Sequence, residues 1–186
     1  MAQKSVKTLI GIIIFPILCL LFSLLILRTD PEFTLLLLKN PEAAAPTKQL
    51  LNYFENNAEI PNIFTEQEKS HLTDVKKLLN SAYYAFGILA AILIYCAQNN
   101  WKPVVKKGTI LLIIILAILF FIPFDAFFTR FHQILFPQGN WQFSPDSTLI
   151  QFYPETFFIS YGIAIAIHAL VAAFFLNYLE IVSRKG

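Results

Sequence analysis

Residues 109–128 have the sequence TILLIIILAILFFIPFDAFF, in which Asp125 is the one charged side chain. A bilayer core about 30 Å thick requires roughly 20 mostly apolar residues in a helix. This stretch therefore predicts a membrane-spanning helix. Three other stretches of similar length and composition predict the same, at residues 9–27, 78–97 and 156–179.

The composition of the whole chain agrees with this prediction. Of the 186 residues, 56% are hydrophobic and 14% are charged, and the mean hydropathy is +0.61. A water-soluble core of this length could not bury so much apolar surface. We therefore expect an all-α membrane protein with four transmembrane helices in a single integral membrane domain, residues 1–186. The first span is long and lacks a small-x-small cleavage site, so we expect an uncleaved anchor and not a signal peptide.

The basic residues predict the orientation, because short cytoplasmic segments carry an excess of Lys and Arg. Half of the 14 basic residues lie in three short runs without acidic residues, 4–7, 102–107 and 184–185; they are Lys4, Lys7, Lys102, Lys106, Lys107, Arg184 and Lys185. The connections 28–77 and 129–155 hold the other basic residues beside ten of the 12 acidic ones. We therefore expect both termini inside the cell, with these two loops forming a small membrane-associated cap on the extracytoplasmic side.

Several function classes have no support in the sequence. The net charge of +2 follows from the expected topology and gives no reason to expect a nucleic-acid partner. Cys19 and Cys96 both fall in expected spans, and no Cys/His spacing indicates a metal site. The motifs of serine hydrolases, zinc proteases, P-loop machines and dinucleotide-binding enzymes are missing from the sequence. We therefore expect no metal and no cofactor.

The first loop contains the clearest helix start, a capping box at residues 65–68. The helix is expected to continue into the second span, and its 3.6-residue period places His71 on the face meant for burial. Asp74 follows at i+3, where its carboxylate could hold the imidazole in one tautomer. The structure of residues 28–64 is left open, since the apolar run 33–38 fits either a strand or a segment lying in the membrane interface.

The second loop carries another candidate histidine. If the helix of the third span continues through residue 136, Asp125 and His132 share one face. An aspartate near the end of a span is costly to ionise and usually marks a functional group or a buried partner. Arg130 carries a guanidinium group that matches phosphate or carboxylate oxygens. Glu155 is expected in the first turn of the fourth span, where the helix dipole favours a carboxylate.

Each of these signals has a structural alternative. Most of the 19 Phe, seven Tyr and two Trp side chains are expected in cores and interfacial belts. One cluster near the second loop could also frame an acyl-chain groove; its members are Trp141, Phe143, Phe152, Tyr153, Phe157 and Phe158. His168 lies among alanines, which favours close helix packing with an interhelical hydrogen bond. His71 and His132 could be interfacial side chains satisfied by water or lipid phosphate, but their shared side and nearby carboxylates favour a site.

Four parts of the chain resemble the bacterial lipoprotein intramolecular transacylases, the Lit family. They are FTEQEKSHLTDVK (64–76), RFHQILF (130–136), Trp141 and LIQFYPETFF (149–158). The resemblance extends over the whole chain. It implies a multi-pass acyltransferase of the bacterial plasma membrane with its active site on the extracytoplasmic side. The implied partners are membrane lipids and a substrate lipoprotein whose N-terminal cysteine carries diacylglycerol on its sulfur.

In the reaction that the resemblance implies, one acyl chain moves from the glyceryl group to the α-amine of the same cysteine, giving an N-acyl lyso-lipoprotein. The substrate supplies its own nucleophile, so the enzyme must provide a base for the amine and an acid for the leaving oxygen. We expect His71 and His132 to be this pair. Asp74 and Asp125 are candidate orienting groups, and the candidate oxyanion donors are Arg130, Lys76 and Tyr153.

Two other functions remain open. A non-enzymatic membrane subunit, or interaction protein, with loops that bind a partner would have the same topology. A phospholipase-like hydrolase would act on similar esters but release free fatty acid. A transporter is disfavoured, because His168 and Asp125 are the ionisable residues within the expected spans and no inverted repeat is visible.

Overall fold

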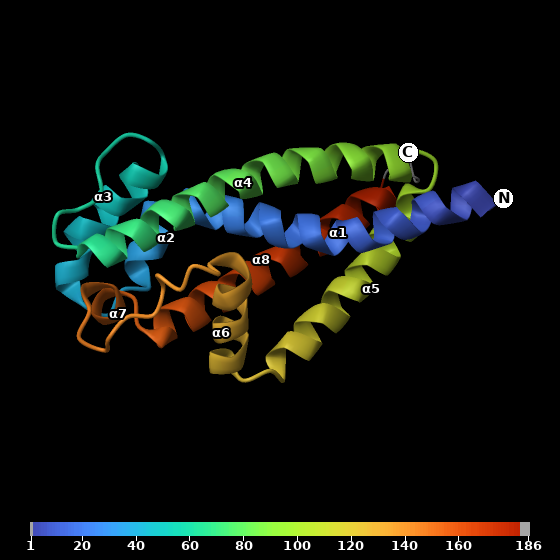
Figure 1. The fold of residues 1–186 in the computed structure, drawn as a ribbon. Coiled ribbons are helices and arrows are strands. Elements are labelled where there is room, and N and C mark those ends of the chain that lie inside the picture. Colours follow the sequence, from blue (N-terminus) through green and yellow to red (C-terminus); the bar gives the residue numbers. More distant parts are fainter. Residues whose placement is uncertain (1, 183–186) are drawn as a thin grey trace. The chain divides into compact units, whose positions relative to one another are not determined.

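The structure is a computed structural model that describes residues 2–182, and the regular elements in this range are all helical (Figure 1). Their bounds are α1 (Ala2–Arg28), α2 (Pro31–Leu36), η1 (Pro41–Ala43), α3 (Ala44–Phe54), α4 (Glu66–Ala97), α5 (Trp101–Phe120), α6 (Phe124–Leu135), α7 (Thr148–Phe152) and α8 (Glu155–Val182). Ser5–Arg28 of α1 and all of α4, α5 and α8 are long and apolar enough to cross a membrane. The prediction of four such helices in an all-α chain is confirmed.

The chain divides into two compact units. The first contains the described parts of residues 1–25, 83–122 and 164–186, and the second contains residues 26–82 and 123–163. Each unit has its own apolar core, and the expectation of one integral membrane domain stays a prediction. Arg184, Lys185 and the side chain of Lys4, which entered the orientation argument, lie outside the described residues.

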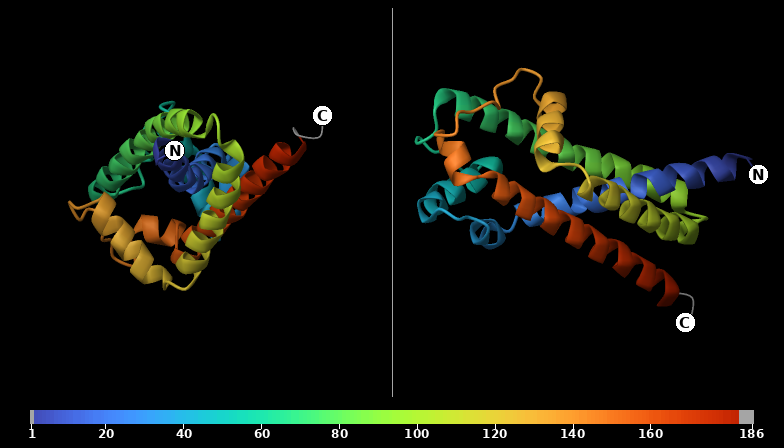
Figure 2. Two further views of the ribbon diagram at one scale, coloured as in Figure 1. Left: turned by 90° about the vertical axis from the view of Figure 1, so that its right-hand side faces the viewer. Right: turned by 90° about the horizontal axis from the view of Figure 1, so that it is seen from below.

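Four helices share the core of the first unit, and each can be followed in Figure 2. Their buried side chains are Ile14, Phe15, Leu18 and Cys19 of α1, Leu93 and Ala97 of α4, Val104, Val105 and Leu112 of α5, and Ala169 and Ala173 of α8. Helices α1 and α5 approach closely at Gly108, where an added Cβ would lie 2.7 Å from the Phe15 ring. Small residues permit such close contact between apolar helices.

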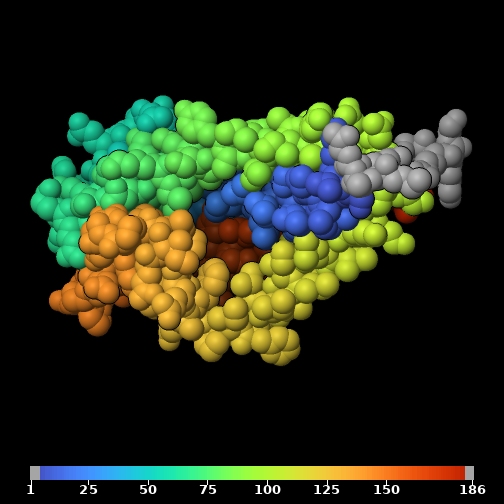
Figure 3. Space-filling view, turned by 45° about the vertical axis from the view of Figure 1, so that its right-hand side comes forward, coloured from blue at the N-terminus to red at the C-terminus, as the bar shows by residue number. Residues whose placement is uncertain are grey.

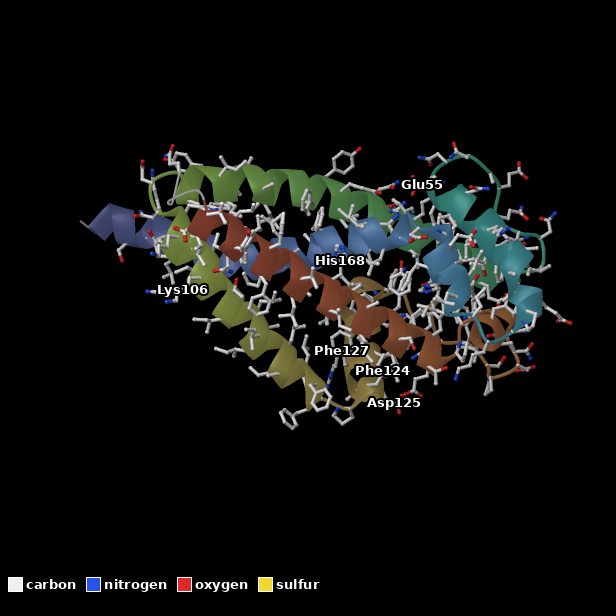
Figure 4. All side chains as sticks on the ribbon, turned by 180° about the vertical axis from the view of Figure 1, so that it is seen from behind. Glu55, Lys106, Phe124, Asp125, Phe127 and His168 are labelled. Atoms are coloured by element: carbon white, nitrogen blue, oxygen red, sulfur yellow. The ribbon has the colours of Figure 1, made fainter. Side chains whose placement is uncertain are left out.

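Polar side chains also link the helices of the first unit. The Nδ1 atom of His168, labelled in Figure 4, lies 3.1 Å from Oγ of Ser23 on α1. Because the Ser23 hydroxyl already donates to the Cys19 carbonyl at 2.7 Å, the imidazole is the donor in this pair. The interhelical hydrogen bond expected of His168 is therefore confirmed. Asn177 of α8 similarly donates to Oγ1 of Thr109 on α5 at 2.7 Å.

The structure differs from the expected span at residues 109–128. Helix α5 ends at Phe120, and α6 begins at Phe124 after a break that contains Pro123. Proline lacks the N–H of a helical hydrogen bond and disfavours the α conformation in the residue before it. Asp125 therefore lies in the first turn of a new helix, and not within the helix that forms the third span.

In the second unit, the first loop folds into short helices. Asp30 caps α2 by accepting a hydrogen bond from the Phe33 N–H at 3.0 Å, so the run that begins at Phe33 is mainly helical and is not a strand. Elements α3, α4, α7 and α8 contribute to one apolar core. Its buried members are Ala43, Leu50, Phe64, Leu72, Leu149, Phe152, Tyr153 and Phe157.

Glu68 joins two elements of this unit. The capping box is confirmed, because the Thr65 N–H donates to Oε2 of Glu68 at 2.7 Å and the Glu68 N–H donates to the Thr65 hydroxyl at 3.3 Å. The second carboxylate oxygen accepts a 2.8 Å hydrogen bond from the Leu149 N–H at the start of α7. The Glu68 residue is 0% exposed. One buried carboxylate thus fixes the segment before α8 to the start of α4.

Replacing Glu68 with alanine is expected to lower the free energy of unfolding by about 3 kcal/mol, since each buried donor left unsatisfied costs roughly 1 to 3 kcal/mol. Denaturation in mixed micelles, followed by circular dichroism, measures this change. The matched control is Glu66→Ala, because the Glu66 side chain is 92% exposed and pairs only at the surface with Lys69. Equal effects of the two substitutions would contradict the role assigned to Glu68.

Candidate active site

His71 and His132 lie together in the second unit. His71 is on the first turns of α4 and His132 is on α6, and each residue is only 8% exposed. Their ring centroids are 5.9 Å apart, with an angle of 33° between the ring planes. In Figure 3 the orange surface of the segment that follows α6 lies directly against the green surface where α4 begins. Residues 61 positions apart in the chain thus meet at one place.

Aromatic rings surround the two imidazoles. His71 has Phe136 at 4.8 Å and Phe143 at 5.5 Å between ring centroids. The rings around His132 are Phe128 at 4.0 Å, Trp141 at 4.9 Å, Phe131 at 5.4 Å and Phe136 at 5.5 Å. Such packing removes water from the ring faces and leaves each imidazole few polar neighbours.

The tautomer of His132 is fixed by the backbone of its own helix. Its Nδ1 atom lies 2.8 Å from the carbonyl oxygen of Phe128, one turn earlier on α6. A carbonyl can only accept, so Nδ1 carries the proton. In the neutral ring the lone pair is therefore on Nε2, which can act as a base.

The structure differs from the expected direct contact between His71 and Asp74. The carboxylate of Asp74 accepts hydrogen bonds from Lys77 at 3.0 Å, from Gln138 at 2.7 Å and from Asn140 at 2.9 Å. The Nδ1 atom of His71 is buried and makes no hydrogen bond of good geometry. Asp74 therefore makes no direct hydrogen bond to the imidazole, and it can affect the orientation of the ring only through the side chains that it binds.

Both imidazoles lie outside the apolar stretches 78–97 and 101–120, and burial disfavours their charged forms. Burial, and next the neighbouring His132, lowers the pKa of His71 from 6.5 to about 4, against the opposing effects of Asp74 and Asn140. Burial also lowers the pKa of His132, while its bond to the Phe128 carbonyl acts in the opposite direction. Two neutral imidazoles at neutral pH can accept protons.

We expect neither imidazole to titrate near pH 6.5. Since a lowered pKa extends the neutral form to lower pH, His71 should protonate only near pH 4, and His132 should protonate at a lower pH than an ordinary imidazole does. The His132→Asn substitution removes one cause of the shift and should raise the pKa of His71. Histidine-selective NMR in nanodiscs, assigned with single variants and compared with the denatured chain, measures both effects. A pKa of 6.5 or higher for either ring would contradict the prediction.

Two of the expected oxyanion donors have other partners. The ammonium group of Lys76 donates to the Tyr53 carbonyl at 2.6 Å and lies 3.9 Å from the centre of the Tyr53 ring. The Tyr153 hydroxyl is buried and lies 2.8 Å from Oγ1 of Thr47. The third, Arg130, is exposed and donates to the Gln133 side chain at 3.0 Å.

The remaining predicted residues are Trp141, Asp125 and Glu155. Trp141 packs against the His132 ring, as described above. Asp125 lies at the N-terminal end of α6, beside Phe124 and Phe127 in Figure 4. Seven residues of helix place it about 10 Å along the axis from His132. Glu155 is exposed in the first turn of α8, as expected.

The sequence did not indicate the amide side chains of Gln138 and Asn140 as neighbours of the site. They flank Gly139, which has a φ of +78°. Glycine tolerates this left-handed conformation, so the chain can turn there and bring Asn140 and Trp141 back toward the imidazoles. Proline and glycine, which occur here at Pro137 and Gly139, are common in turns, but they do not specify which side chains a turn brings to the site.

Comparison with known proteins gives the family. A family profile described as "Lipoprotein intramolecular transacylase Lit" matches residues 5–158. The chain belongs to the Lit family. The resemblance found in the sequence is thus confirmed, and the chain is a multi-pass membrane protein of a lipoprotein acyltransferase family.

Two solved structures of Bacillus cereus Lit agree in fold with this Lit family member, and one curated protein matches it in sequence. The in meso structure of the Lit transacylase from Bacillus cereus has a TM-score of 0.79 at 20% identity, covering 99% of this chain and 98% of that one. A variant of the same protein with a histidine-to-alanine substitution has a TM-score of 0.75, also at 20% identity, over 99% and 96% of the two chains. An uncharacterized protein of Aquifex aeolicus (strain VF5) is 27% identical over 126 residues, or 66% of this chain and 58% of the relative.

Proposed function

We propose that this protein catalyses intramolecular acyl transfer in bacterial lipoproteins, from the S-glyceryl group to the α-amine of the N-terminal cysteine. The observation that carries the proposal is the pair of buried imidazoles of His71 and His132, 5.9 Å apart between centroids. Family membership supplies the substrate class. No covalent enzyme intermediate is required, because the attacking amine belongs to the substrate.

The bonds made and broken define what the site must do. The amine nitrogen attacks the ester carbonyl, and collapse of the tetrahedral intermediate breaks the bond to the glyceryl oxygen. One amine proton ends on that oxygen, so the reaction balances without a co-reactant. Counting from nitrogen through Cα, Cβ, sulfur, two glyceryl carbons and the ester oxygen to the acyl carbon gives an eight-membered ring. Closing it depends mainly on positioning.

The imidazoles provide the proton transfers in this mechanism. The free α-amine has a pKa of about 7.7 to 8.0, so much of it is protonated at neutral pH. A neutral imidazole with a lone pair on Nε2, such as that of His132, can remove this proton. The other ring accepts at its Nε2 the second proton, which the amine releases as it attacks, and then donates that proton to the departing glyceryl oxygen. At 5.9 Å, the two rings are close enough to contact one lipidated cysteine.

We assign stabilisation of the oxyanion to Arg130. Its partner is the exposed side chain of Gln133, so releasing it for substrate costs one surface hydrogen bond. Lys76 is instead hydrogen-bonded to Tyr53, and Tyr153 is hydrogen-bonded to Thr47. Both contribute to the structure around the site. Asp125, about two helical turns from His132, has no part in the proposed mechanism.

We also propose that both termini are cytoplasmic and that loops 28–77 and 129–155 form an extracytoplasmic cap, within one integral membrane domain. The distribution of basic residues supports this orientation. Contacts between the two loops support the cap, including the bond from Gln67 to the Gln142 carbonyl at 3.1 Å. Single cysteines at Asn57 and Lys106, in a chain without Cys19 and Cys96, should react with an impermeant reagent from outside and inside, respectively.

The proposed function is tested with the purified protein in nanodiscs and a synthetic lipopeptide that carries S-diacylglyceryl cysteine with a free amine. Mass spectrometry should find N-acyl lyso-lipopeptide of unchanged total mass. An N-acetylated substrate is the control and should remain unmodified. Release of free fatty acid from both substrates would instead indicate a phospholipase-like hydrolase. No turnover of either would favour a non-enzymatic subunit.

A further inference from the structure

Asn140 occupies a defined position beside His71. Its side-chain nitrogen donates to Oδ2 of Asp74 at 2.9 Å and to Oγ of Ser70 at 3.2 Å. Ser70 and Asp74 are one turn apart on α4, on either side of His71 in the sequence. The amide of Asn140 therefore spans the helical turn that carries the imidazole.

These contacts determine how the amide group is oriented. A carboxylate can only accept, so the NH₂ group of Asn140 must face Asp74. The oxygen atom of the amide, Oδ1, then remains available to accept a hydrogen bond from another group. This oxygen is buried and makes no hydrogen bond of good geometry, and the same is true of Nδ1 of His71.

The two buried atoms are complementary. An imidazole Nδ1–H is a donor, an amide oxygen is an acceptor, and buried polar groups in native proteins are nearly always paired. The Asn140 amide also raises the pKa of His71, as an acceptor near the ring does. A hydrogen bond between them would satisfy both buried atoms.

We propose that Asn140 is a positioning residue, whose Oδ1 accepts the Nδ1 proton of His71 and so leaves the lone pair of the neutral ring on Nε2. Asp74 acts through this amide, because it fixes the NH₂ group and thereby the oxygen. His132 reaches the same tautomer by a different route, through the Phe128 carbonyl. Both imidazoles of the pair then present Nε2 as the reactive atom. The catalytic consequence rests on the proposed acyl transfer, but the tautomer does not.

Gln138 provides a matched control. It lies two residues earlier and donates to the same oxygen of Asp74, at 2.7 Å. It has the same amide group, but its oxygen is not one of the buried unpaired atoms beside His71. If Asn140 acted only by anchoring the loop to Asp74, substitutions at the two positions would have similar effects.

The experiment measures the tautomer of His71 by ¹⁵N NMR of histidine-labelled protein in nanodiscs, assigned with His71→Asn. In the wild type and in Gln138→Ala, Nδ1 should carry the proton. In Asn140→Leu, which keeps the shape of the side chain, and in Asn140→Ala, the Nε2–H form should become substantial. The tautomer of His132 should stay the same in every variant, which reports that the site is still folded.

The rate of acyl transfer is measured on the same samples. Both Asn140 variants should lose about 10- to 100-fold in kcat, the range found for groups that orient a metal-binding histidine, with little change in KM. Gln138→Ala should stay near the wild-type rate. Unchanged His71 tautomers in both Asn140 variants would overturn the assignment of Asn140. A tautomer shift in a protein whose wild type transfers no acyl chain would support that assignment and overturn the proposed function.

Discussion

Replacing either His71 or His132 with alanine is expected to lower the rate of acyl transfer by about 10²- to 10⁴-fold, the usual contribution of a general acid or base. The two rings are 5.9 Å apart and buried among aromatic residues, with Phe136 packed against both, so solvent cannot readily take over the proton transfer. The double variant should be only modestly slower than the slower single variant, because groups that work as a unit are strongly non-additive. Single-turnover assays with the S-diacylglyceryl lipopeptide measure these rates.

Exogenous imidazole separates lost chemistry from lost structure. His71→Ala leaves a space between Phe136 and Phe143 of about the size of the deleted ring. Added imidazole should restore part of the rate in this variant, and should not affect the wild type. His168→Ala is the control for replacing a histidine, since His168 belongs to the first unit and bonds to Ser23. Wild-type rates in both His71→Ala and His132→Ala would rule out the two-imidazole mechanism.

The features that the sequence predicted correctly are determined by local physics. Apolar runs of about 20 residues require helices in a membrane, whatever surrounds them. The capping box at Thr65 and Glu68 depends on residues three positions apart. The break at Pro123 was also local, but the apolar residues on both sides made residues 109–128 resemble one continuous span.

The features that could not be predicted depend on contacts between distant residues. Asp74 was expected to face His71 because of its i+3 spacing, which takes no account of other donors. Gln138 and Asn140, 64 and 66 residues away, compete for the same carboxylate, and only the packing of the second loop brings them there. The two histidines could be identified as candidates from periodicity and charge, but their separation in space could not.

Replacing Trp141 with alanine is expected to redirect the reaction from transfer to hydrolysis. The Trp141 ring covers His132 at 4.9 Å between centroids, and its removal opens one side of the imidazole to water. Water can then compete with the amine for the ester, which excluding solvent from an active site prevents. The ratio of free fatty acid to N-acyl product should rise roughly 10- to 100-fold, which corresponds to about 1.4 to 2.7 kcal/mol in relative barriers.

Assays in H₂¹⁸O measure this ratio directly, because hydrolysis places ¹⁸O in the released fatty acid, whereas transfer incorporates none. Trp101→Ala is the matched control, since Trp101 is the other tryptophan of the chain and lies at the start of α5 in the first unit. It should leave the ratio of products unchanged. A Trp141→Ala variant that slows transfer without any gain in ¹⁸O-labelled fatty acid would mean that Trp141 positions His132 and does not exclude water.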